Sequence, residues 1–481
     1  MKLRDILSGI DYELRGDIDT EVSSICYDSR KAEKNSLFFC IVGFAVDGHN
    51  YAAAAVKNGA SAIVVTRFLE DIDAVQILVK NDRQAMALIS ANFYGNPAKK
   101  MKMIGVTGTK GKTSTTYMLK AILEAAGEKV GLIGTIYYMI GEKVIPAKHT
   151  TPEAPDLQAL LAEMQEAGMT SVVMEVSSSA LIFDRVYGMR FDAAVYTNLS
   201  QDHMDIHGDF DNYAAAKQIL FKNADISIGN IDDSHGRFML EGADKKKFTY
   251  AIEQKADYRA YDIELSSQNS RFMLETKDFR MPLYIELPGK FMVYNALAAV
   301  SCCLELGIDL VQVKRGLEAI HGVPGRFEKL DTKGMPYTII LDYAHTPDSL
   351  ENILTSVKLF AKGRIVCLFG CGGNRDNTKR PLMGAVTEKY ADLAIVTTDN
   401  PRFEEPADII AQITAGMTSD RYIVIENRLE AIRYAIENAK KDDVIILAGK
   451  GHEYYQEIKG VRYDFNEKEI VEEIMQEITN K

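Results

Sequence analysis

Residues 103–114, MIGVTGTKGKTS, decide the fold of this chain. The apolar run Met103–Val106 predicts a buried strand, and a glycine-rich turn separates it from a predicted helix at Ser114–Ala126. Glycines let backbone N–H groups close around phosphate oxygens, and the N-terminus of the following helix adds partial positive charge. The stretch therefore predicts a nucleotide phosphate site at a strand–turn–helix junction.

The turn is a variant of the usual phosphate loop. The strict Walker spacing requires a glycine five residues before Gly111, where this chain has Val106, and Gly108 stands two residues later instead. We expect Lys112 to reach the outer phosphates and the Thr113 hydroxyl to ligate magnesium. An ordinary flexible strand–helix turn is the alternative, but the GKT run between a strand and a helix favours the nucleotide site.

Buried strands alternate with helices on both sides of this loop, which predicts an α/β fold with parallel sheets. The 481 residues suggest about three domains at roughly 150 residues each. We expect a central P-loop-type ATPase sheet and a C-terminal Rossmann-like, doubly wound domain. The N-terminal block has short apolar runs at 36–42, 60–65 and 74–79 between alanine-rich helical stretches. Strands are predicted at 130–133, 171–176, 193–197, 337–341, 364–369, 393–397, 422–425 and 444–447, and C-terminal helices at 348–361, 380–391, 405–417 and 428–440.

Composition narrows the class of protein. Apolar residues make up 47% and charged residues 26% of the chain, as in ordinary globular proteins, and the net charge of −12 disfavours a nucleic-acid binder. We find neither an apolar run of membrane-spanning length nor a signal-peptide core. The six cysteines form no CxxC pair, which indicates reduced, mostly buried thiols. We therefore expect a cytoplasmic protein that binds no membrane. A monomer is our further expectation.

The loop Gly108–Thr113 (GTKGKT) resembles that of the Mur ligase family. Further blocks resemble family motifs and occur in family order: EVSS at 175–178, TNLSQDH at 197–203, YAAAKQILF at 213–221, GRFE at 325–328 and DYAHTP at 342–347. The resemblance implies three domains, which would be a UDP-binding domain at 1–98, an ATP-binding domain at 99–327 and a Rossmann-like amino-acid-binding domain at 328–481.

The chain is most similar to family members that extend UDP-MurNAc-L-Ala-D-Glu by a diamino acid during peptidoglycan precursor synthesis. The resemblance implies an ADP-forming acid–amino-acid ligase that uses ATP and Mg²⁺. A substrate carboxylate would attack the γ-phosphate, and an amine would then displace phosphate from the acyl phosphate. The work of the protein in such chemistry is mainly alignment and charge neutralisation.

The resemblance also assigns residues to the ATP and magnesium sites. Catalytic roles fall on Lys112, Glu175, His203 and Lys217, and magnesium ligation on Thr113, Glu175, His203 and Lys217, the last as a carbamylated lysine. ATP would contact Gly108, Thr109, Lys110, Gly111, Lys112, Thr113, Ser114, Asn295, Arg326 and Asp342. Taken alone, Glu175 and Lys217 are typical of solvated side chains and His203 of a structural histidine. His203 and His207 have zinc-like spacing but too few ligands.

The nucleotide-sugar dipeptide would contact Ser29, Thr150, Thr151, Ser177 and Arg185 by the same resemblance. The chain departs from common family residues at four positions near its sites: Phe44, Ser179, Phe183 and Met292. An apolar Phe44 removes a polar side-chain contact to UDP, and Met292 removes one to adenine.

The run Asp399-Asn400-Pro401-Arg402 resembles the selector motif for meso-diaminopimelate. An arginine fork binds a carboxylate bidentately and repels a lysine ammonium, which favours the substrate with a distal carboxylate. The remaining amino-acid contacts would be Arg375, Gly449 and Glu453. L-Lysine or another diamino acid stays the alternative, and the same residues also suit a type I turn and a helix-start loop.

Two other functions remain open from the sequence. One is a folylpolyglutamate synthetase-like amide ligase, which the N-terminal block and the selector motif disfavour. The other is a non-catalytic nucleotide-binding regulatory protein, which the joint presence of Lys112, Thr113, Glu175, His203 and Lys217 disfavours.

Overall fold

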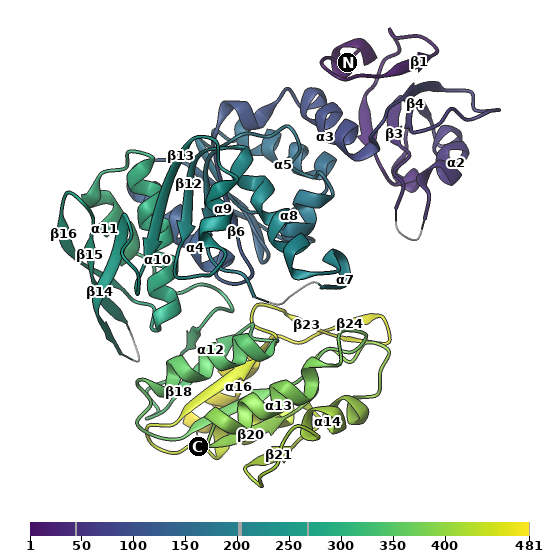
Figure 1. The fold of residues 1–481 in the computed structure, drawn as a ribbon. Helices are drawn as coiled ribbons and strands as arrows, with labels where there is room; N and C mark the ends of the chain where they lie inside the picture. The colour runs from purple at the N-terminus through teal and green to yellow at the C-terminus, as the bar shows by residue number, and fades with distance from the viewer. Residues whose placement is uncertain (44–45, 201–203, 267–268, 481) are drawn as a thin grey trace. The chain divides into compact units, whose positions relative to one another are not determined.

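The computed structural model describes residues 1–43, 46–200, 204–266 and 269–480 (Figure 1). The chain divides into two compact units. The first unit comprises Met1–Tyr250 and Val300–Asp309, and the second comprises Ala251–Ala299 and the chain from Leu310 onward. No helix among the described residues is long and apolar enough to cross a membrane. The domain boundaries at 98 and 327 lie inside these units and stay a prediction.

The first unit opens with a sheet of strand order β1-β5-β4-β3-β2, in which β1 is antiparallel to β5 and the other pairs are parallel. Along β3 and the residue that follows it, Leu37 and Phe39 pack in one apolar cluster with α1 and α3, whereas Phe38 and Cys40 pack in another with α2. The period-2 alternation of a strand thus buries both faces of this sheet. Its elements are α1 (Leu3–Ile6), β1 (Glu13–Arg15), β2 (Ser24–Cys26), β3 (Ser36–Phe39), α2 (Ala52–Lys57), β4 (Ala60–Val65), β5 (Val75–Leu78) and α3 (Asp82–Phe93).

The larger sheet of the first unit has the strand order β13-β12-β11-β6-β10-β7-β8-β9. Its strands are β6 (Lys102–Thr107), β7 (Val130–Ile133), β8 (Tyr137–Ile140), β9 (Lys143–Pro146), β10 (Ser171–Glu175), β11 (Phe191–Tyr196), β12 (Ala224–Asn230) and β13 (Lys246–Ala251). The helices are α4 (Lys112–Ala125), α5 (Ala154–Glu166), α6 (Ser178–Ile182), α7 (Met204–His207), α8 (Phe210–Lys222) and α9 (Gly236–Glu241).

Strand β6 lies between β10 and β11 and is parallel to both. The chain runs from β6 past β10 to β7, and then returns to fill β10 and β11 on either side of β6. Such a change of direction opens a crevice at the carboxyl ends of the strands, where α/β folds place ligands. The register pairs Glu175 with Val106 and Tyr196 with Thr107, so three strands end beside the phosphate loop.

The second unit begins with the antiparallel strands β14 (Tyr258–Leu265), β15 (Ser270–Glu275) and β16 (Arg280–Ile285). Helix α10 (Lys290–Glu305) begins in this unit, and α11 (Leu310–Glu318) follows. The alternating strands of this meander show no parallel crossover, and the sequence pattern did not predict them.

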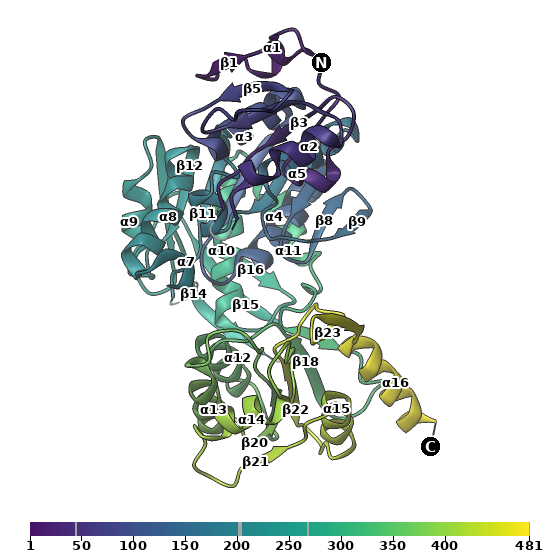
Figure 2. The same cartoon turned by 90° about the vertical axis from the view of Figure 1, so that its right-hand side faces the viewer.

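The C-terminal sheet has the strand order β17-β18-β22-β19-β20-β21, with β17 antiparallel to β18 and the remaining pairs parallel. Helices α12, α13 and α14 cover one face, and α15 and α16 cover the other (Figure 2). The strands are β17 (Glu328–Leu330), β18 (Thr338–Asp342), β19 (Ile365–Phe369), β20 (Leu393–Val396), β21 (Tyr422–Val424), β22 (Val444–Ala448) and the hairpin β23 (Tyr455–Ile458) and β24 (Val461–Asp464). The helices are α12 (Pro347–Lys358), α13 (Lys379–Tyr390), α14 (Pro406–Thr414), α15 (Arg428–Glu437) and α16 (Glu467–Thr479).

The predicted α/β fold is confirmed: each central and C-terminal strand expected from an apolar run is present within two residues of its expected ends. The six cysteines are free and buried, as expected. The antiparallel additions were not predicted, because short, partly exposed strands such as Lys143–Pro146 carry no apolar run.

Candidate active site

The phosphate loop follows β6 directly and requires glycine at two positions. Gly108 has φ +148°, and a Cβ atom there would lie 1.9 Å from the Thr197 hydroxyl oxygen. Gly111 has φ +84° and caps the N-terminus of α4. Both conformations are accessible mainly to glycine, which explains the spacing of the loop.

A second strand end holds the loop from the side. The Thr109 amide donates to the Asn198 carbonyl oxygen over 2.8 Å, and the Lys110 amide donates to Asn198 Oδ1 over 2.9 Å. In return, Asn198 Nδ2 and the Thr197 hydroxyl donate to the Lys110 carbonyl oxygen over 3.0 and 2.6 Å. The block TNLS after β11 is therefore a clamp on the phosphate loop.

The ammonium of Lys112 lies over this loop, where Nζ donates to the carbonyl oxygens of Gly108 (2.8 Å) and Thr109 (3.0 Å). Thr113 and Ser114 are buried in the first turn of α4. The predicted ATP contacts of residues 108–114 are thus gathered at a helix N-terminus that faces the end of β6, the arrangement that binds phosphate.

Glu175 is fully buried at the end of β10, so the interpretation as a solvated strand-end residue is wrong. Its Oε1 accepts from the Thr135 amide over 2.9 Å, and its Oε2 accepts from the Thr135 hydroxyl over 3.0 Å. The Thr135 hydroxyl also lies 3.1 Å from that of Thr150, a predicted dipeptide contact. Thr135 is a residue that sequence reasoning missed, although its place directly after β7 could have indicated it.

Lys217 is also buried, at 1% exposure, so the interpretation as a solvated helix lysine is wrong. Its Nζ donates to the Gly108 carbonyl oxygen over 3.1 Å and lies 4.5 Å from the centre of the Tyr213 ring. Helix α8 thereby brings a second lysine, besides Lys112, to the carbonyl oxygen of Gly108. The predicted ligand His203 lies outside the described residues, while His207 contacts the Ser178 hydroxyl at 2.9 Å.

Magnesium suits the oxygen donors that the first unit offers. Within the described part of the chain, no cluster of three or more His, Cys, Asp and Glu side chains could hold a metal ion by itself. Magnesium needs fewer protein ligands, since it keeps several waters and binds one or two carboxylates together with substrate phosphates. The buried Glu175 carboxylate and the Thr113 hydroxyl are hard oxygen donors of that kind.

Three predicted dipeptide contacts form one group beside Glu175. The Thr151 hydroxyl donates to the Glu175 carbonyl oxygen over 2.9 Å and accepts from the Ser177 amide over 3.1 Å. Arg185 donates through Nη1 to the Thr151 carbonyl oxygen over 2.9 Å and pairs through Nη2 with Glu153 at 2.6 Å. The group places a guanidinium next to the end of β10, where it can bind a substrate carboxylate.

The predicted UDP contact Ser29 lies in the N-terminal sheet layer, in the 3₁₀ turn Ser29–Lys31, and is half-buried. The nearby Tyr27 hydroxyl donates to Asp156 of α5 over 2.5 Å, which ties this turn to the larger sheet of the same unit. Of the departures from the family, Ser179 bonds to Ser177 at 3.1 Å and Phe183 lies 5.1 Å from the guanidinium of Arg83. Phe44 lies outside the described residues.

The predicted adenosine contacts lie in the second unit. Asp342 ends β18 and accepts from the Phe327 amide over 2.7 Å, and the guanidinium of Arg326 lies 4.8 Å from the Tyr343 ring centre. Asn295 is buried on α10, where its amide contacts Met292 Sδ at 3.8 Å. Met292 therefore takes up part of the hydrogen-bonding capacity of Asn295.

His452 stacks against Tyr343 with ring centres 4.9 Å apart. Burial, together with the positive charge of Arg326, lowers the pKa of His452 to about 3. The imidazole is therefore neutral at physiological pH. His452 adds no positive charge beside Arg326.

The predicted amino-acid contacts converge at the carboxyl ends of β20 and β22. Asn400 Nδ2 donates to Glu453 Oε2 over 2.8 Å, and Asp399 lies against Gly449, whose Cβ would be 2.6 Å from Asp399 Oδ2. Gly449 has φ +115°, so both the space and the backbone conformation require glycine there. The insertion of β22 between β18 and β19 brings these loops together.

The two predicted arginines lie on adjacent loops. Arg402 Nη1 donates to the Gly373 carbonyl oxygen over 2.8 Å, and Arg402 Nε lies 3.4 Å from a carboxylate oxygen of Glu457. A Cβ on Gly372 would lie 2.9 Å from Arg402 Nη1 and 3.9 Å from Cγ of Arg375, whose side chain is exposed. The arrangement offers two guanidiniums to carboxylates from neighbouring strand ends.

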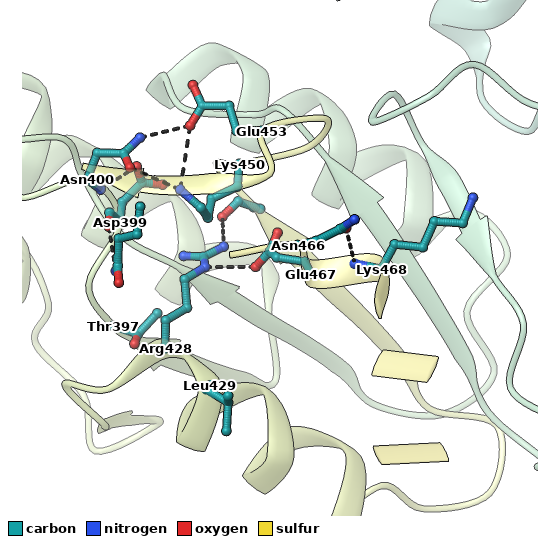
Figure 3. Close-up of polar contacts among 12 residues, drawn as sticks. Thr397, Asp399, Asn400, Arg428, Leu429, Lys450, Glu453, Asn466, Glu467 and Lys468 are labelled. Carbon is teal, nitrogen blue, oxygen red and sulfur yellow. Dashed lines mark hydrogen bonds and ion pairs between the residues drawn. The ribbon is translucent and has the colours of Figure 1, made fainter. Parts of the chain in front are cut away.

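Three charge pairs, each with a buried cation, support these loops, and sequence reasoning missed all three. Arg428 Nε donates to Glu467 over 2.7 Å with both side chains fully buried, and Lys450 lies 3.5 Å from Glu453 (Figure 3). The third pair is Arg380 with Glu404, at 2.8 Å. The partners of the Arg380 and Arg428 pairs are 24 and 39 residues apart, so no local motif indicates them. Lys450 and Glu453 are only three residues apart, and both belong to the Gly-Lys-Gly-His-Glu run.

The cations Lys450 and Arg428 act on the ionisation of the predicted substrate contacts. Burial alone would raise the pKa of Asp399, but Lys450 and Arg428 outweigh it and hold this pKa below its usual value. Burial and the neighbouring Asp399 raise the pKa of Glu453. The loop cluster therefore contains one firmly ionised carboxylate and one whose ionisation depends on the cations around it.

Comparison with known proteins identifies the family. Residues 21–94 match the catalytic domain of the Mur ligase family, residues 106–303 the Mur ligase middle domain and residues 325–451 the Mur ligase glutamate ligase domain. The chain is 47% identical to UDP-N-acetylmuramoyl-L-alanyl-D-glutamate–2,6-diaminopimelate ligase 1 of Clostridium acetobutylicum (99% of this chain, 100% of the relative). It is 50% identical to the correspondingly named ligase of Caldanaerobacter subterraneus (99% of each chain).

Solved structures agree with this assignment. A structure of a UDP-N-acetylmuramoyl-L-alanyl-D-glutamate–2,6-diaminopimelate ligase superposes with a TM-score of 0.74 at 30% identity and covers 100% of both chains. The MurF ligase of Thermotoga maritima in complex with ADP shares the fold, with a TM-score of 0.65 at 18% identity over 94% of this chain and 97% of that one. The family predicted from the sequence motifs is confirmed, and the chain belongs to the Mur ligase family.

Proposed function

We propose that the chain is the ATP-dependent ligase that adds meso-diaminopimelate to UDP-MurNAc-L-Ala-D-Glu, with ADP and phosphate as the other products. The full-length identity of 47–50% to relatives named for this reaction supports the proposal. The observation that carries it is the loop cluster of the second unit, where the Arg402 guanidinium and the Glu453 carboxylate lie on the converging ends of β20 and β22. A substrate with a distal carboxylate and a distal amine needs both charges.

The phosphate loop serves the activation step. Its backbone N–H groups and Lys112 would bind the phosphates of ATP, so that negative charge is neutralised as the γ-phosphoryl group leaves. Magnesium, when bound, adds to this neutralisation. Thr113, Glu175 and, once carbamylated, Lys217 would hold it, because carbamylation replaces an ammonium by a carboxylate.

The dipeptide end of the nucleotide sugar would lie along the group beside Glu175. Arg185, with Thr150, Thr151 and Ser177, would orient the D-Glu carboxylate toward the γ-phosphate and leave it free to attack. Ser29 would bind the UDP end, and Asn295, Arg326 and Asp342 the adenosine end of ATP. These roles follow from the family resemblance, and Thr151, Ser177 and Asp342 also stand close to strand ends.

The choice of meso-diaminopimelate over L-lysine would depend on Arg402 and Arg375. A carboxylate can accept two parallel hydrogen bonds from a guanidinium, whereas the ammonium of lysine would be repelled there. Asp399, Asn400, Pro401 and Gly449 would shape the loop around this contact, and Glu453 would receive the ammonium. The enzyme would act in the cytoplasm as a monomer in peptidoglycan precursor synthesis.

A phosphate-release assay tests the proposal. The protein is mixed with ATP, Mg²⁺ and UDP-MurNAc-L-Ala-D-Glu, and either meso-diaminopimelate or L-lysine is added. We expect release that requires the nucleotide sugar and is faster with meso-diaminopimelate. Absence of amino-acid-dependent release would refute the ligase function, while a preference for L-lysine would refute only the proposed selection by arginine.

The modification of Lys217 needs its own test. We expect the activity of carbon-dioxide-depleted enzyme to recover on addition of bicarbonate, and we expect a Lys217→Met variant to show no such recovery. Recovery in that variant, or identical activity of depleted and replete wild-type enzyme, would contradict carbamylation at this position.

A further inference from the structure

Lys450 belongs to the amino-acid loops, by which we mean residues 399–402 after β20 and 449–453 after β22, and its side chain is fully inaccessible. It follows β22, and its Nζ donates to Asn400 Oδ1 over 3.1 Å and lies 3.5 Å from Glu453 Oε2. The rings of Tyr455 and Phe465 lie 5.8 and 5.9 Å away. Burial of a charge is costly unless it is paired, so the contacts with Asn400 and Glu453 are what keep this ammonium in place.

The ammonium determines which way the amide of Asn400 faces. Asn400 Oδ1 accepts from Lys450 Nζ and also from the Glu457 amide over 2.9 Å, which uses both acceptor positions of the oxygen. The NH₂ group must therefore face the other side, where it donates to Glu453 Oε2 (Figure 3). A reversed amide would place its oxygen against a carboxylate and its donors against an ammonium.

Glu453 is the member of this group that a ligand can reach. Its side chain keeps 16% exposure, whereas the side chain of Lys450 keeps none. Two donors from separate loops hold its Oε2, the amide of Asn400 and the ammonium of Lys450. The charged and titratable groups that act on this carboxylate are Asp399 after β20, Lys450 on its own loop, Arg428 of α15, Tyr343 after β18 and Tyr455 of β23.

Among the cations, Lys450 is the one placed to act on Glu453 directly. Arg428 is paired with Glu467 at 2.7 Å and also donates to the Ala448 carbonyl oxygen over 2.9 Å. Burial and Asp399 raise the pKa of Glu453, and Lys450 opposes that rise. An ammonium ligand binds an ionised carboxylate far better than a neutral one, so the charge of Lys450 favours binding.

We propose that Lys450 is a positioning residue of the amino-acid site: through the Asn400 amide and through its own charge, it holds the Glu453 carboxylate ready for the ammonium of the incoming diamino acid. The inference rests on the proposed function, because it needs a diamino acid at this site. It assigns Lys450 no contact with the substrate.

The main test is a Lys450→Met variant in the phosphate-release assay. We expect the KM for meso-diaminopimelate to rise about tenfold, the size typical of a lost hydrogen bond to a charged group. The KM values for ATP and for the nucleotide sugar should stay unchanged. The exposed Lys441, changed to Met in the same unit, is the matched control and should leave all three constants as in the wild type.

The pH profile separates positioning from a general structural role. Without the cation the pKa of Glu453 should rise, so the increase in KM should be largest near neutral pH and should shrink as the pH is raised. A Lys450→Gln variant keeps a donor for Asn400 but lacks the charge, and should show the shifted pH profile with a smaller increase in KM. Lys450→Arg should restore part of the affinity.

A double-mutant cycle with Asn400→Ala tests the path through the amide. If Lys450 acts through Asn400, the two increases in KM should combine to less than their product. KM increases that combine to their full product, together with an unshifted pH profile, would overturn the inference. An unchanged KM in a folded Lys450→Met protein would also overturn it. If this variant does not fold, the pH profile of Lys450→Gln decides. Failure of the proposed function looks different, because the wild-type protein would then release no phosphate in response to meso-diaminopimelate.

Discussion

The phosphate loop of the first unit and the amino-acid loops of the second unit are stabilised in different ways. The phosphate loop is held by backbone geometry, with glycines at positive φ and amides bonded to Asn198. The amino-acid loops are held by buried charges such as the Arg428–Glu467 and Lys450–Glu453 pairs. A backbone constraint can be recognised from a short run of residues in the sequence. A charge pair depends on which distant segments the fold brings together.

Loss of one buried partner should produce the largest effect. Arg428→Met would leave the Glu467 carboxylate buried without its cation, and we expect the free energy of unfolding to fall by about 3–5 kcal/mol. Urea unfolding of the full chain measures this change. The more exposed Arg433, which pairs with Glu477, is the control, and Arg433→Met should change the stability little. Equal effects of the two substitutions would contradict the role of burial in the second unit.

Removal of the Lys112 ammonium should lower catalysis at the phosphate loop but leave the stability of the fold nearly unchanged. We expect Lys112→Ala to lower kcat by about a hundredfold or more, because a cation aimed at developing charge is lost. The unfolding transition should change little, since the loop is also held by the Asn198 contacts. The exposed Lys129, changed to Ala, serves as control. Near-normal turnover in Lys112→Ala would remove the assigned role.

Arg402 tests specificity at the amino-acid loops. Arg402→Ala should raise the KM for meso-diaminopimelate about tenfold, which matches the loss of one charge-assisted contact. The KM for ATP should not change, because the contacts of Arg402 lie at Gly373 and Glu457. An exposed neighbour, Lys459, can be changed to Ala for comparison. We would abandon the selector role if the KM for meso-diaminopimelate were unaffected.

The smallest effect should come from His452. Burial and Arg326 lower its pKa to about 3 in the folded chain, so the unfolded chain takes up a proton near the ordinary value that the folded chain does not. The stability that His452 contributes is therefore present above pH 6.5 and falls as the pH drops. Between pH 7 and 5.5 the wild type should lose about 1 kcal/mol more than His452→Gln. Parallel stability profiles of the two proteins would show that the histidine is not buried as a neutral group.

Much of the fold could be predicted because parallel strands buried on both faces are continuous apolar runs. Val130–Ile133 has the predicted bounds for this reason, and the apolar run Ala60–Val65 coincides with a strand. The hairpin β23–β24 could not be predicted, since its residues are half-buried or exposed and follow no apolar run. The strand order could not be predicted either. Strand β22 lies between β18 and β19, which are far from it in the sequence, and no local pattern indicates that pairing.

The candidate site shows the same division. The motif around Gly108 and Gly111 pointed to phosphate, and the structure gives both glycines positive φ. The burial of Glu175 and Lys217 was not visible in the sequence, which equally suited solvated side chains, because burial depends on the strands and helices packed around a residue. Predictions that fell on His203 and Phe44 lie outside the described residues.

The sequence by itself determined the family, the α/β class and the phosphate loop, because each depends on local spacing that a chain carries in any environment. Only the tertiary structure decided that Lys450 faces Asn400 and Glu453, and that Arg428 meets Glu467. The physical reason is that a buried charge is stable only where other segments supply its partner. That partner is chosen by sheet order and helix packing rather than by neighbours along the chain.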